Sequence, residues 1–238
     1  MVPQAPDYGS PVSRLRVATF NIRHGLGTGG TLDLARTARV IEAIDPDIIS
    51  LQEVDRNLER SGNQDQADVL AAMTGLRFHF APARVRGAGA YGIALGLKKE
   101  AGEAEGVVES FPLPRVDEEE PRVAQSTRLR GISFVATHLS VRPGPRDVQM
   151  MDLAKRLRYL TSPAVVFGDL NASRRGLGHL VAAGLRPGPK HATMSFRRQV
   201  DHILLPPGLG DVRFRTIPTD ASDHDPLIAD LEVPGARP

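Results

Sequence analysis

The chain has 238 residues, no cysteine and a formal net charge of +2. This length is compatible with one α/β domain, and we treat residues 1–238 as a single domain. The lack of cysteine excludes a disulfide framework, a thiolate nucleophile and a cysteine-ligated metal. The nearly balanced charge argues against a strongly basic nucleic-acid-binding surface.

The ends of the chain show no targeting or membrane-spanning pattern. Residues 1–11 are polar and rich in proline, without the apolar stretch of a signal peptide. No apolar run approaches the roughly 20 residues that a membrane helix needs. We therefore expect a cytoplasmic monomer without stable membrane insertion, with mobile tails at about 1–13 and 234–238.

The hydrophobic pattern predicts more strands than helices. Alternating and β-branched segments predict strands over residues 14–22, 48–52, 91–97, 107–110, 122–129, 132–137, 164–167, 200–205, 212–217 and 227–233. Apolar residues at helical spacing predict helices over 33–44, 66–74, 146–160 and 177–183. In the longest helix, we expect Val148, Met151, Leu157 and Leu160 to face the core. Because helices separate only some strands, the pattern favours an α+β fold of two packed mixed β-sheets flanked by helices, rather than a doubly wound parallel sheet.

The segment Gly168-Asp169-Leu170-Asn171 follows the apolar strand predicted at 164–167. Gly168 is expected to end that strand and let the backbone turn. Asp169 and Asn171 are two residues apart, so in extended geometry their side chains point to the same side. A carboxylate that activates water beside an amide that donates to a phosphate suits phosphoester hydrolysis. Taken alone, the segment is more typical of a local Asx-turn than of a catalytic site, because Asp and Asn commonly serve loops in this way.

Other predicted strand ends also carry polar residues. These clusters are Asn21, Gln52-Glu53, Thr137-His138, Asp223-His224 and, near a strand start, Asp201-His202. Loops at strand ends often hold the chemistry of an enzyme on a rigid scaffold. So many clusters exceed what turn formation requires, which favours the functional interpretation of Asp169 and Asn171.

The side chains at these ends predict a metal site. Glu53 with Asn and Asp side chains offers hard oxygen ligands that suit Mg²⁺, or Mn²⁺. Three histidines, His138, His202 and His224, suggest Zn²⁺ as a second choice, although a lone histidine beside a strand is more often structural. The chain lacks a Gly-x-Ser-x-Gly segment, which argues against a serine hydrolase.

Six short motifs in this order resemble those of the endonuclease/exonuclease/phosphatase superfamily, the deoxyribonuclease I-like metal-dependent hydrolases. They are Thr19-Phe20-Asn21-Ile22, Leu51-Gln52-Glu53-Val54, Thr137-His138-Leu139, Gly168-Asp169-Leu170-Asn171, Val200-Asp201-His202-Ile203 and Ser222-Asp223-His224. Each motif is weak singly, but together they span nearly the whole chain. The resemblance implies a four-layer α/β sandwich and metal-dependent hydrolysis of a phosphoester by an activated water.

The resemblance also implies a role for each matching residue. On the metal side, Glu53 is the main ligand, Asn21 lies beside it and Asp223 is close to the ion.

On the substrate side, Asp169 positions or deprotonates the water. Asn171 and His138 contact the phosphate, and His138 is also a candidate acid for the leaving group. His224 contacts the phosphate and is held in orientation by Asp201.

Three further positions bear on the resemblance. Ile93 stands where many relatives have Asn, so the resemblance does not supply a polar contact there. Arg23 stands where the nearest relatives often have His, and we interpret it as a solvated loop residue in preference to a second phosphate contact. Arg122 resembles a family position near the site.

Three classes of function remain open for the sequence. The favoured one is a phosphodiesterase or phosphatase acting on a small or lipid-derived phosphoester. A nuclease is the alternative: the absence of Trp leaves few stacking platforms for single strands, but the pairs Arg174-Arg175 and Arg197-Arg198 flank the site motifs. A catalytically inactive binding module is less favoured, because Glu53, Asp169 and His224 are all intact.

Overall fold

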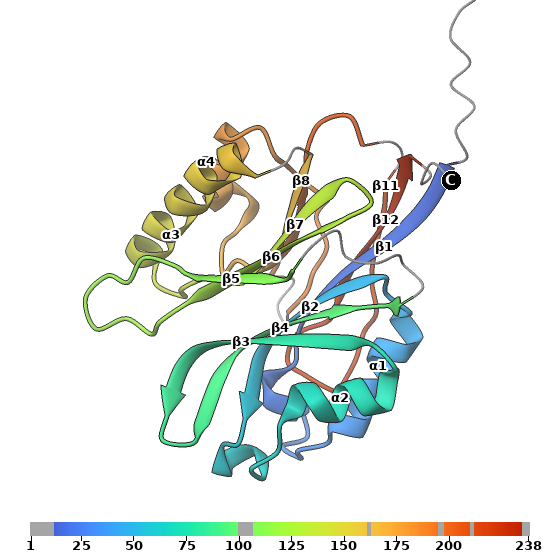
Figure 1. Cartoon of the computed structure of the whole chain (residues 1–238), viewed down its shortest axis with the longest axis vertical. Helices are drawn as coiled ribbons and strands as arrows, with labels where there is room; N and C mark the ends of the chain where they lie inside the picture. Colours follow the sequence, from blue (N-terminus) through green and yellow to red (C-terminus); the bar gives the residue numbers. More distant parts are fainter. Residues whose placement is uncertain (1–11, 100–106, 161–162, 195–197, 210–211, 235–238) are drawn as a thin grey trace, which may run out of the picture.

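Two six-stranded β-sheets form the centre of the protein (Figure 1). The computed structural model describes residues 12–99, 107–160, 163–194, 198–209 and 212–234. The sheets pack face to face and helices cover their outer faces, so the predicted α+β fold is confirmed. Within the described ranges, no helix is long and apolar enough to cross a membrane.

The first sheet has the strand order β11-β12-β1-β2-β4-β3. Its strands are β1 (Val12–Asn21), β2 (Ile48–Arg56), β3 (Arg77–Arg86), β4 (Gly89–Leu97), β11 (Val212–Thr216) and β12 (Leu227–Pro234). Strands β1 and β2 are parallel, and the other pairs are antiparallel. The carboxyl ends of β1 and β2 therefore meet at one edge.

The second sheet has the order β5-β6-β7-β8-β10-β9. Its strands are β5 (Glu109–Pro112), β6 (Val123–Leu129), β7 (Ile132–His138), β8 (Ala164–Asp169), β9 (Arg186–Pro187) and β10 (Asp201–Leu205). Strands β7 and β8 are its parallel pair. Both sheets are thus mixed, as expected.

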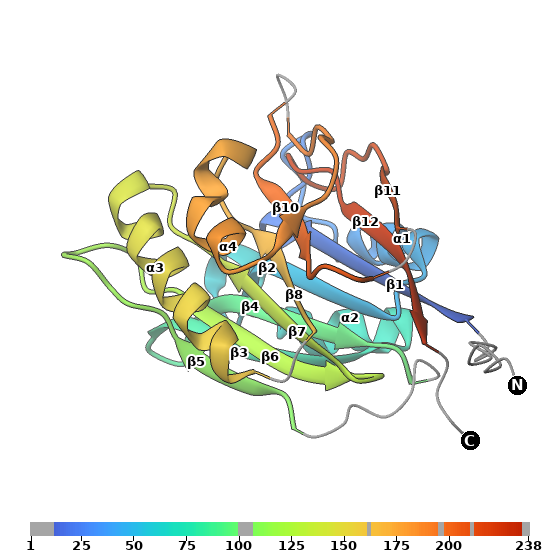
Figure 2. The ribbon, with the colours of Figure 1, turned by 90° about the horizontal axis from the view of Figure 1, so that it is seen from above.

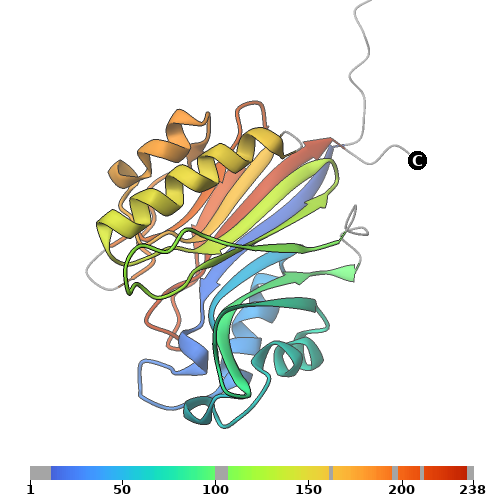
Figure 3. The ribbon, with the colours of Figure 1, turned by 60° about the vertical axis from the view of Figure 1, so that its left-hand side comes forward.

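Helices lie on both outer faces of the sheet pair (Figures 2 and 3). Helices α1 (Leu34–Ile44) and α2 (Gln66–Thr74) pack on the first sheet, and α3 (Pro143–Arg156) and α4 (Gly178–Ala182) pack on the second. Short 3₁₀ turns occupy Arg23–Gly25 (η1), Glu59–Ser61 (η2), Leu157–Tyr159 (η4) and Arg174–Leu177 (η5). The carboxylates of Asp33 and Asp65 cap α1 and α2 by accepting backbone N–H groups.

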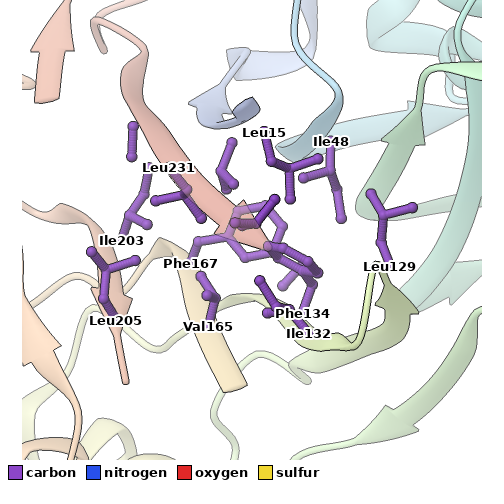
Figure 4. Packing of buried hydrophobic residues seen from close by; sticks show 14 of the residues in the cluster. Leu15, Ile48, Leu129, Ile132, Phe134, Val165, Phe167, Ile203, Leu205 and Leu231 are labelled. Atoms are coloured by element: carbon purple, nitrogen blue, oxygen red, sulfur yellow. The ribbon is translucent and has the colours of Figure 1, made fainter. Parts of the chain in front are cut away.

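The inner faces of both sheets enclose the central core (Figure 4). Leu15 and Ile48 from the first sheet and Phe134 and Phe167 from the second are each fully buried. The two phenylalanine rings meet edge to face, with centroids 6.1 Å apart. In the inner strands, such as β1, β2, β7 and β8, alternate residues reach a second core under the helices, so these strands are held on both faces and their ends are fixed in space.

The sequence predictions missed strands β3 and β9 and misplaced the start of the long helix. Strand β3 was not predicted: it lies at the edge of its sheet, contains Pro82 and has many exposed residues, so its hydrophobic pattern is weak. The long helix begins at Pro143, where the first turn tolerates a missing N–H, and it buries Met150 and Leu153, whereas Met151 is 39% exposed.

Gly168 does not end the strand as predicted, because β8 continues to Asp169. The φ angle of Gly168 is +148°, and a Cβ atom there would overlap the carbonyl oxygen of Thr137 on the neighbouring strand β7. Gly168 therefore allows close approach of the two parallel strands whose ends carry His138 and Asp169.

We predict that Gly168→Ala lowers the free energy of unfolding by about 3 kcal/mol or more, because the new Cβ meets rigid backbone at a positive φ. The control is Gly178→Ala, where no atom lies within 4 Å of the new Cβ and the change should be within about 1 kcal/mol. Urea unfolding followed by circular dichroism measures both. Equal stability of the two variants would contradict the close-approach argument.

Candidate active site

The candidate active site lies where the ends of both sheets meet. The register places Asn21 beside Gln52 on β1 and β2, and His138 beside Asp169 on β7 and β8. Strand β10 runs antiparallel to β8, so its first residue, Asp201, pairs with Asp169. The topology thus explains why predicted strand ends and one predicted strand start supply a single site.

Asn21 connects the two sheets. Its side chain is 1% exposed, and its Nδ2 donates to Glu53 Oε1 at 3.0 Å and to Asp169 Oδ2 at 3.1 Å. Its Oδ1 accepts the backbone N–H of Arg23 at 3.1 Å, which fixes the orientation of the amide. Asn21 therefore lies beside Glu53 as expected, but its oxygen is already engaged.

Glu53 sits at an irregularity of β2. The pairing with β4 shifts register between Gln52 and Val54, and Glu53 has a φ of +56°. Such a bulge turns a side chain away from the regular alternation of the strand. The carboxylate is partly buried and, in the part of the chain that is described, has no basic side chain within ion-pair distance. A cation is the natural complement of this group.

The carboxylate of Asp169 accepts two hydrogen bonds and lies close to two histidine rings. Oδ1 accepts the backbone N–H of Asn171 at 2.9 Å, and Oδ2 lies 3.5 Å from His138 Nε2 and 4.0 Å from His224 Nε2 in addition to its bond with Asn21. Burial, followed by the charge of Asp201, raises the pKa of Asp169 to about 7. A carboxylate in this state can accept a proton near neutral pH.

Asn171 adopts a different backbone conformation from the extended one predicted. Its φ is +49°, and the bond from its N–H to Asp169 is that of an Asx-turn. Its side-chain amide donates to the carbonyl of Leu139 at 3.0 Å. Asn171 therefore takes part in a local Asx-turn and also lies next to Asp169, so the two interpretations of this segment do not exclude each other.

His224 and Asp201 form a buried pair. Nδ1 of His224 lies 2.8 Å from Asp201 Oδ2, in agreement with the expected partnership. Burial alone would lower the pKa of His224, but the charge and hydrogen bond of Asp201 raise it to about 9. His224 is consequently a cation at neutral pH, placed between the carboxylates of Asp201 and Asp169. Ser222 fixes its backbone by accepting the N–H of His224 and donating to the carbonyl of Asn21.

His138 has the opposite electrostatic environment. Burial, then the positive charges of Arg122 and His224, hold its pKa well below the usual 6.5. Arg122 Nη1 lies 3.0 Å from His138 Nδ1, and because a guanidinium can only donate, Nδ1 must be the acceptor. The remaining proton of the neutral ring is therefore on Nε2, the atom that approaches Asp169. Arg122 is itself 6% exposed and pairs with Glu120 at 3.0 Å.

Two other residues singled out from the sequence make no direct side-chain contact with Asp169 among the described residues. The Asp223 side chain is 42% exposed and its nearest basic group is Arg23, at 4.0 Å. His202, the remaining histidine proposed for zinc, directs Nε2 to the carbonyl of Ala172 at 2.8 Å. His202 is thus a structural residue, because alternation along β10 places it on the opposite face from Asp201.

Three residues of the cluster have the spacing of a metal site. Ligand atoms of Asp169, Asp201 and His224 all lie within 4.8 Å of one another. His224 already donates to Asp201, so in this arrangement the imidazolium takes the place that a cation would fill between the two acids. The unpaired carboxylate of Glu53, joined to Asp169 through Asn21, offers the better complement to a hard cation.

The sequence profile described as the Endonuclease/Exonuclease/phosphatase family matches residues 18–224. The chain belongs to this family. Family members are hydrolases of phosphoester bonds that depend on a divalent metal. A comparison with curated proteins by sequence gives no match.

Solved structures of the family share the fold. A Beutenbergia cavernae endonuclease/exonuclease/phosphatase is 21% identical with a TM-score of 0.76, and covers 94% of this chain and 72% of its own. Truncated TDP2 from Caenorhabditis elegans is 20% identical with a TM-score of 0.67, and the match covers 92% of this chain and 98% of TDP2. The human Nocturnin catalytic domain is 20% identical with a TM-score of 0.66, and the match covers 96% of this chain and 99% of the Nocturnin domain.

The surroundings of Ile93 are apolar. Ile93 is 2% exposed and packs with Ala81 and Val123. It therefore adds no polar group to the site. Tyr91, two residues earlier, is the polar residue that β4 contributes, and the sequence pattern alone indicates no role for it.

Tyr91 lies beside the cluster of polar residues described above. Burial and the charge of Glu53 raise its pKa, while the charge and hydrogen bond of Arg122 act in the opposite direction. The guanidinium of Arg60 lies 5.4 Å from the centre of its ring, and Arg60 also binds both oxygens of the fully buried Asp55, at 2.7 and 2.8 Å. A fixed aromatic ring therefore borders Glu53 and Arg122.

We predict that Asp201→Asn lowers the pKa of His224 from about 9 towards or below the ordinary 6.5, because burial then acts without its countercharge. An NMR titration of the ring measures this. Asp223→Asn is the control and should cause a smaller decrease, since Asp223 is more exposed and does not bond the ring. An unchanged His224 pKa in Asp201→Asn would count against the pair.

We predict that Arg122→Met raises the pKa of His138 and leaves its ring as a mixture of tautomers, because the charge and the donor to Nδ1 are both removed. Long-range ¹H–¹⁵N correlation spectra report the tautomer directly. Arg142→Met removes a similar charge that pairs with Glu119 instead, and should leave His138 unchanged. A single Nε2–H tautomer persisting in Arg122→Met would refute the assignment.

Proposed function

We propose that the protein is a divalent-metal-dependent phosphoesterase that hydrolyses a phosphodiester or phosphomonoester of a small or lipid-derived substrate by attack of water. The observation that carries this proposal is the convergence on one buried carboxylate, Asp169, of Asn21, His138 and His224. Asp169 is the proton acceptor of this set, Asn21 and His138 are neutral hydrogen-bond donors, and His224 is a charged one. Membership of the family supports the reaction class.

Asp169 orients the attacking water and accepts its proton. Its raised pKa of about 7 makes it a stronger base than an ordinary carboxylate, while it remains largely ionised at slightly alkaline pH. The Asn21 and Asn171 donors fix both of its oxygens. The base is therefore held in one orientation before substrate binds.

His224 and His138 stabilise the negative charge that develops on the phosphate oxygens. His224 supplies a positive charge that Asp201 maintains, and His138 supplies a neutral Nε2–H that Arg122 maintains. The low pKa of His138 favours a hydrogen-bond donor over an acid for the leaving group. The second amide proton of Asn171 completes the donors toward the phosphate.

Glu53 is the residue that would hold the metal, with Asp223 as a second oxygen donor and Asn21 in a positioning role. All the candidate ligands are oxygens, which suits Mg²⁺ or Mn²⁺ better than Zn²⁺. When bound, such an ion supplies positive charge to the phosphate and polarises its bonds. Among the described residues the Glu53 carboxylate has no cationic partner, and this supports the assignment.

The charge of the chain supports a small substrate over a long nucleic acid. Duplex binding gains much of its strength from counterion release, and a net charge of +2 provides few neutralising groups. Arg174 and Arg175 lie exposed on η5 just after Asn171, whereas Arg197 is outside the described residues. A nuclease thus remains the second candidate. The human Nocturnin structure contains a bound sulfate anion, and ANGEL2 is described as a 2',3'-cyclic phosphatase, which are properties of those proteins.

We predict that hydrolysis of bis-p-nitrophenyl phosphate requires Mg²⁺ or Mn²⁺ and falls by roughly 100-fold or more in Glu53→Gln, because the variant keeps the shape of the side chain and removes its charge. Excess EDTA should abolish the wild-type rate. Glu109→Gln, on the exposed edge strand β5, is the control and should retain full activity.

Undiminished turnover in EDTA would overturn the metal requirement. The same assay, extended to inositol phosphates, sphingomyelin, abasic DNA and plasmid DNA, tests the substrate class. Efficient plasmid nicking that persists at physiological salt would make the nuclease the leading function.

A further inference from the structure

A cleft of about 320 Å³ lies next to the catalytic cluster and takes no part in the proposed chemistry. Its basic and aromatic lining consists of Arg60, Arg84, Arg86 and Tyr91. Leu58, Glu59 and Glu120 complete the lining. The cleft is formed by the β3–β4 hairpin, the turn η2 and the segment before β6, which are distinct from the strand ends that carry Asp169 and His224.

The sheet register builds one wall of this cleft. Tyr91 on β4 pairs with Asp55 on β2 and with Arg84 on β3, so these three residues form a row across three strands on one sheet face. Arg86 is two residues beyond Arg84 on the same face, whereas Val85, between them, is 66% exposed on the other. The two arginines therefore project together from an edge strand.

The charges of the cleft are not balanced. Arg60 is held by Asp55, and Glu120 is held by Arg122. In the described ranges neither Arg84 nor Arg86 has an acidic partner within ion-pair distance or a hydrogen-bond acceptor, and only Glu59 remains to oppose them. Two unpaired guanidinium groups at a hollow surface suit an anion with several oxygens, such as a phosphate.

Tyr91 connects the cleft with the catalytic cluster. It lines the cleft, and it also lies close enough to Glu53 and Arg122 for the charges of both to shift its pKa. Arg122 in turn contacts His138 at 3.0 Å. A substrate whose reacting phosphate is at Glu53 and His138 can therefore extend past Tyr91 toward Arg84 and Arg86.

We propose that this cleft is a subsite for a second, non-reacting phosphate of the substrate, bound by Arg84 and Arg86, with Tyr91 contacting the group that joins the two phosphates. The inference rests on the proposed function and narrows its substrate class to molecules with two or more phosphates. Both a small bisphosphate and the neighbouring phosphate of a nucleic-acid strand have this chemistry.

The test compares two esters that differ only in the second phosphate. Thymidine 5′-(p-nitrophenyl phosphate) and its 3′-phosphorylated counterpart are hydrolysed by wild type and by Arg84→Gln and Arg86→Gln at fixed Mg²⁺. Arg77→Gln is the matched control, because Arg77 is an exposed residue at the other end of β3. We expect each cleft variant to raise KM for the 3′-phosphorylated ester by roughly fivefold or more, without changing kcat or the KM of the other ester.

Binding of thymidine 3′,5′-bisphosphate, measured by calorimetry, separates this proposal from the proposed function. Loss of affinity in Arg84→Gln and Arg86→Gln but not in Arg77→Gln supports the subsite even if neither ester is hydrolysed. Hydrolysis with equal KM values for both esters in all variants overturns the subsite and leaves the phosphoesterase standing. Competition by oligothymidylate stronger than by the bisphosphate, lost in the cleft variants, supports the subsite and identifies a strand as the source of the phosphate.

Discussion

The side-chain amide of Asn21 holds together two carboxylates that come from different sheets. Glu53 from the first sheet and Asp169 from the second both accept from its Nδ2, at 3.0 and 3.1 Å. Buried carboxylates repel one another and lose their hydration, so their approach requires shared donors. The packing of the sheets supplies the position of this donor, because Asn21 ends a strand buried on both faces. The separation of Glu53 from Asp169 is thus a consequence of how the two sheets pack.

The charges of the residues around Asp169 determine the protonation states of the two neighbouring histidines. Asp201 keeps His224 charged, and Arg122 keeps His138 neutral, although both rings lie beside the same carboxylate. Two histidines consequently differ in protonation state: burial and Arg122 favour the neutral ring of His138, and Asp201 favours the charged ring of His224. A change at Arg122 acts on the site through His138, whereas a change at Asp201 acts on both His224 and Asp169.

The sequence predicted the fold, and it predicted strand ends that the structure brings together, for definite physical reasons. Motif residues at strand ends are positioned by backbone register, so Asn21, His138 and Asp201 could be placed from the sequence alone. Strand β3 could not, since an edge strand with Pro82 lacks the burial that produces a pattern. The roles of Tyr91 and Arg122 depend on side chains that meet across strands distant in sequence, which no spacing along the chain reveals. The Asx-turn at Asn171 shows why Asp and Asn at a strand end cannot be assigned to turn or chemistry alone: here one hydrogen bond serves both.

The strand ends around Asp169 could be predicted from the sequence and the edge strand of the β3–β4 hairpin could not, and we propose different functions for these two parts. The strand ends around Asp169 carry the chemistry that we propose, and they are fixed by the buried cores of both sheets. The β3–β4 hairpin lies at the sheet edge, where its outer residues are free of packing constraints. An edge of this kind can exchange Arg84 or Arg86 for other residues without disturbing the core. In the proposed subsite, selectivity for a substrate belongs to this hairpin, and the partly buried Tyr91 lies between the hairpin and the residues around Glu53 and Arg122.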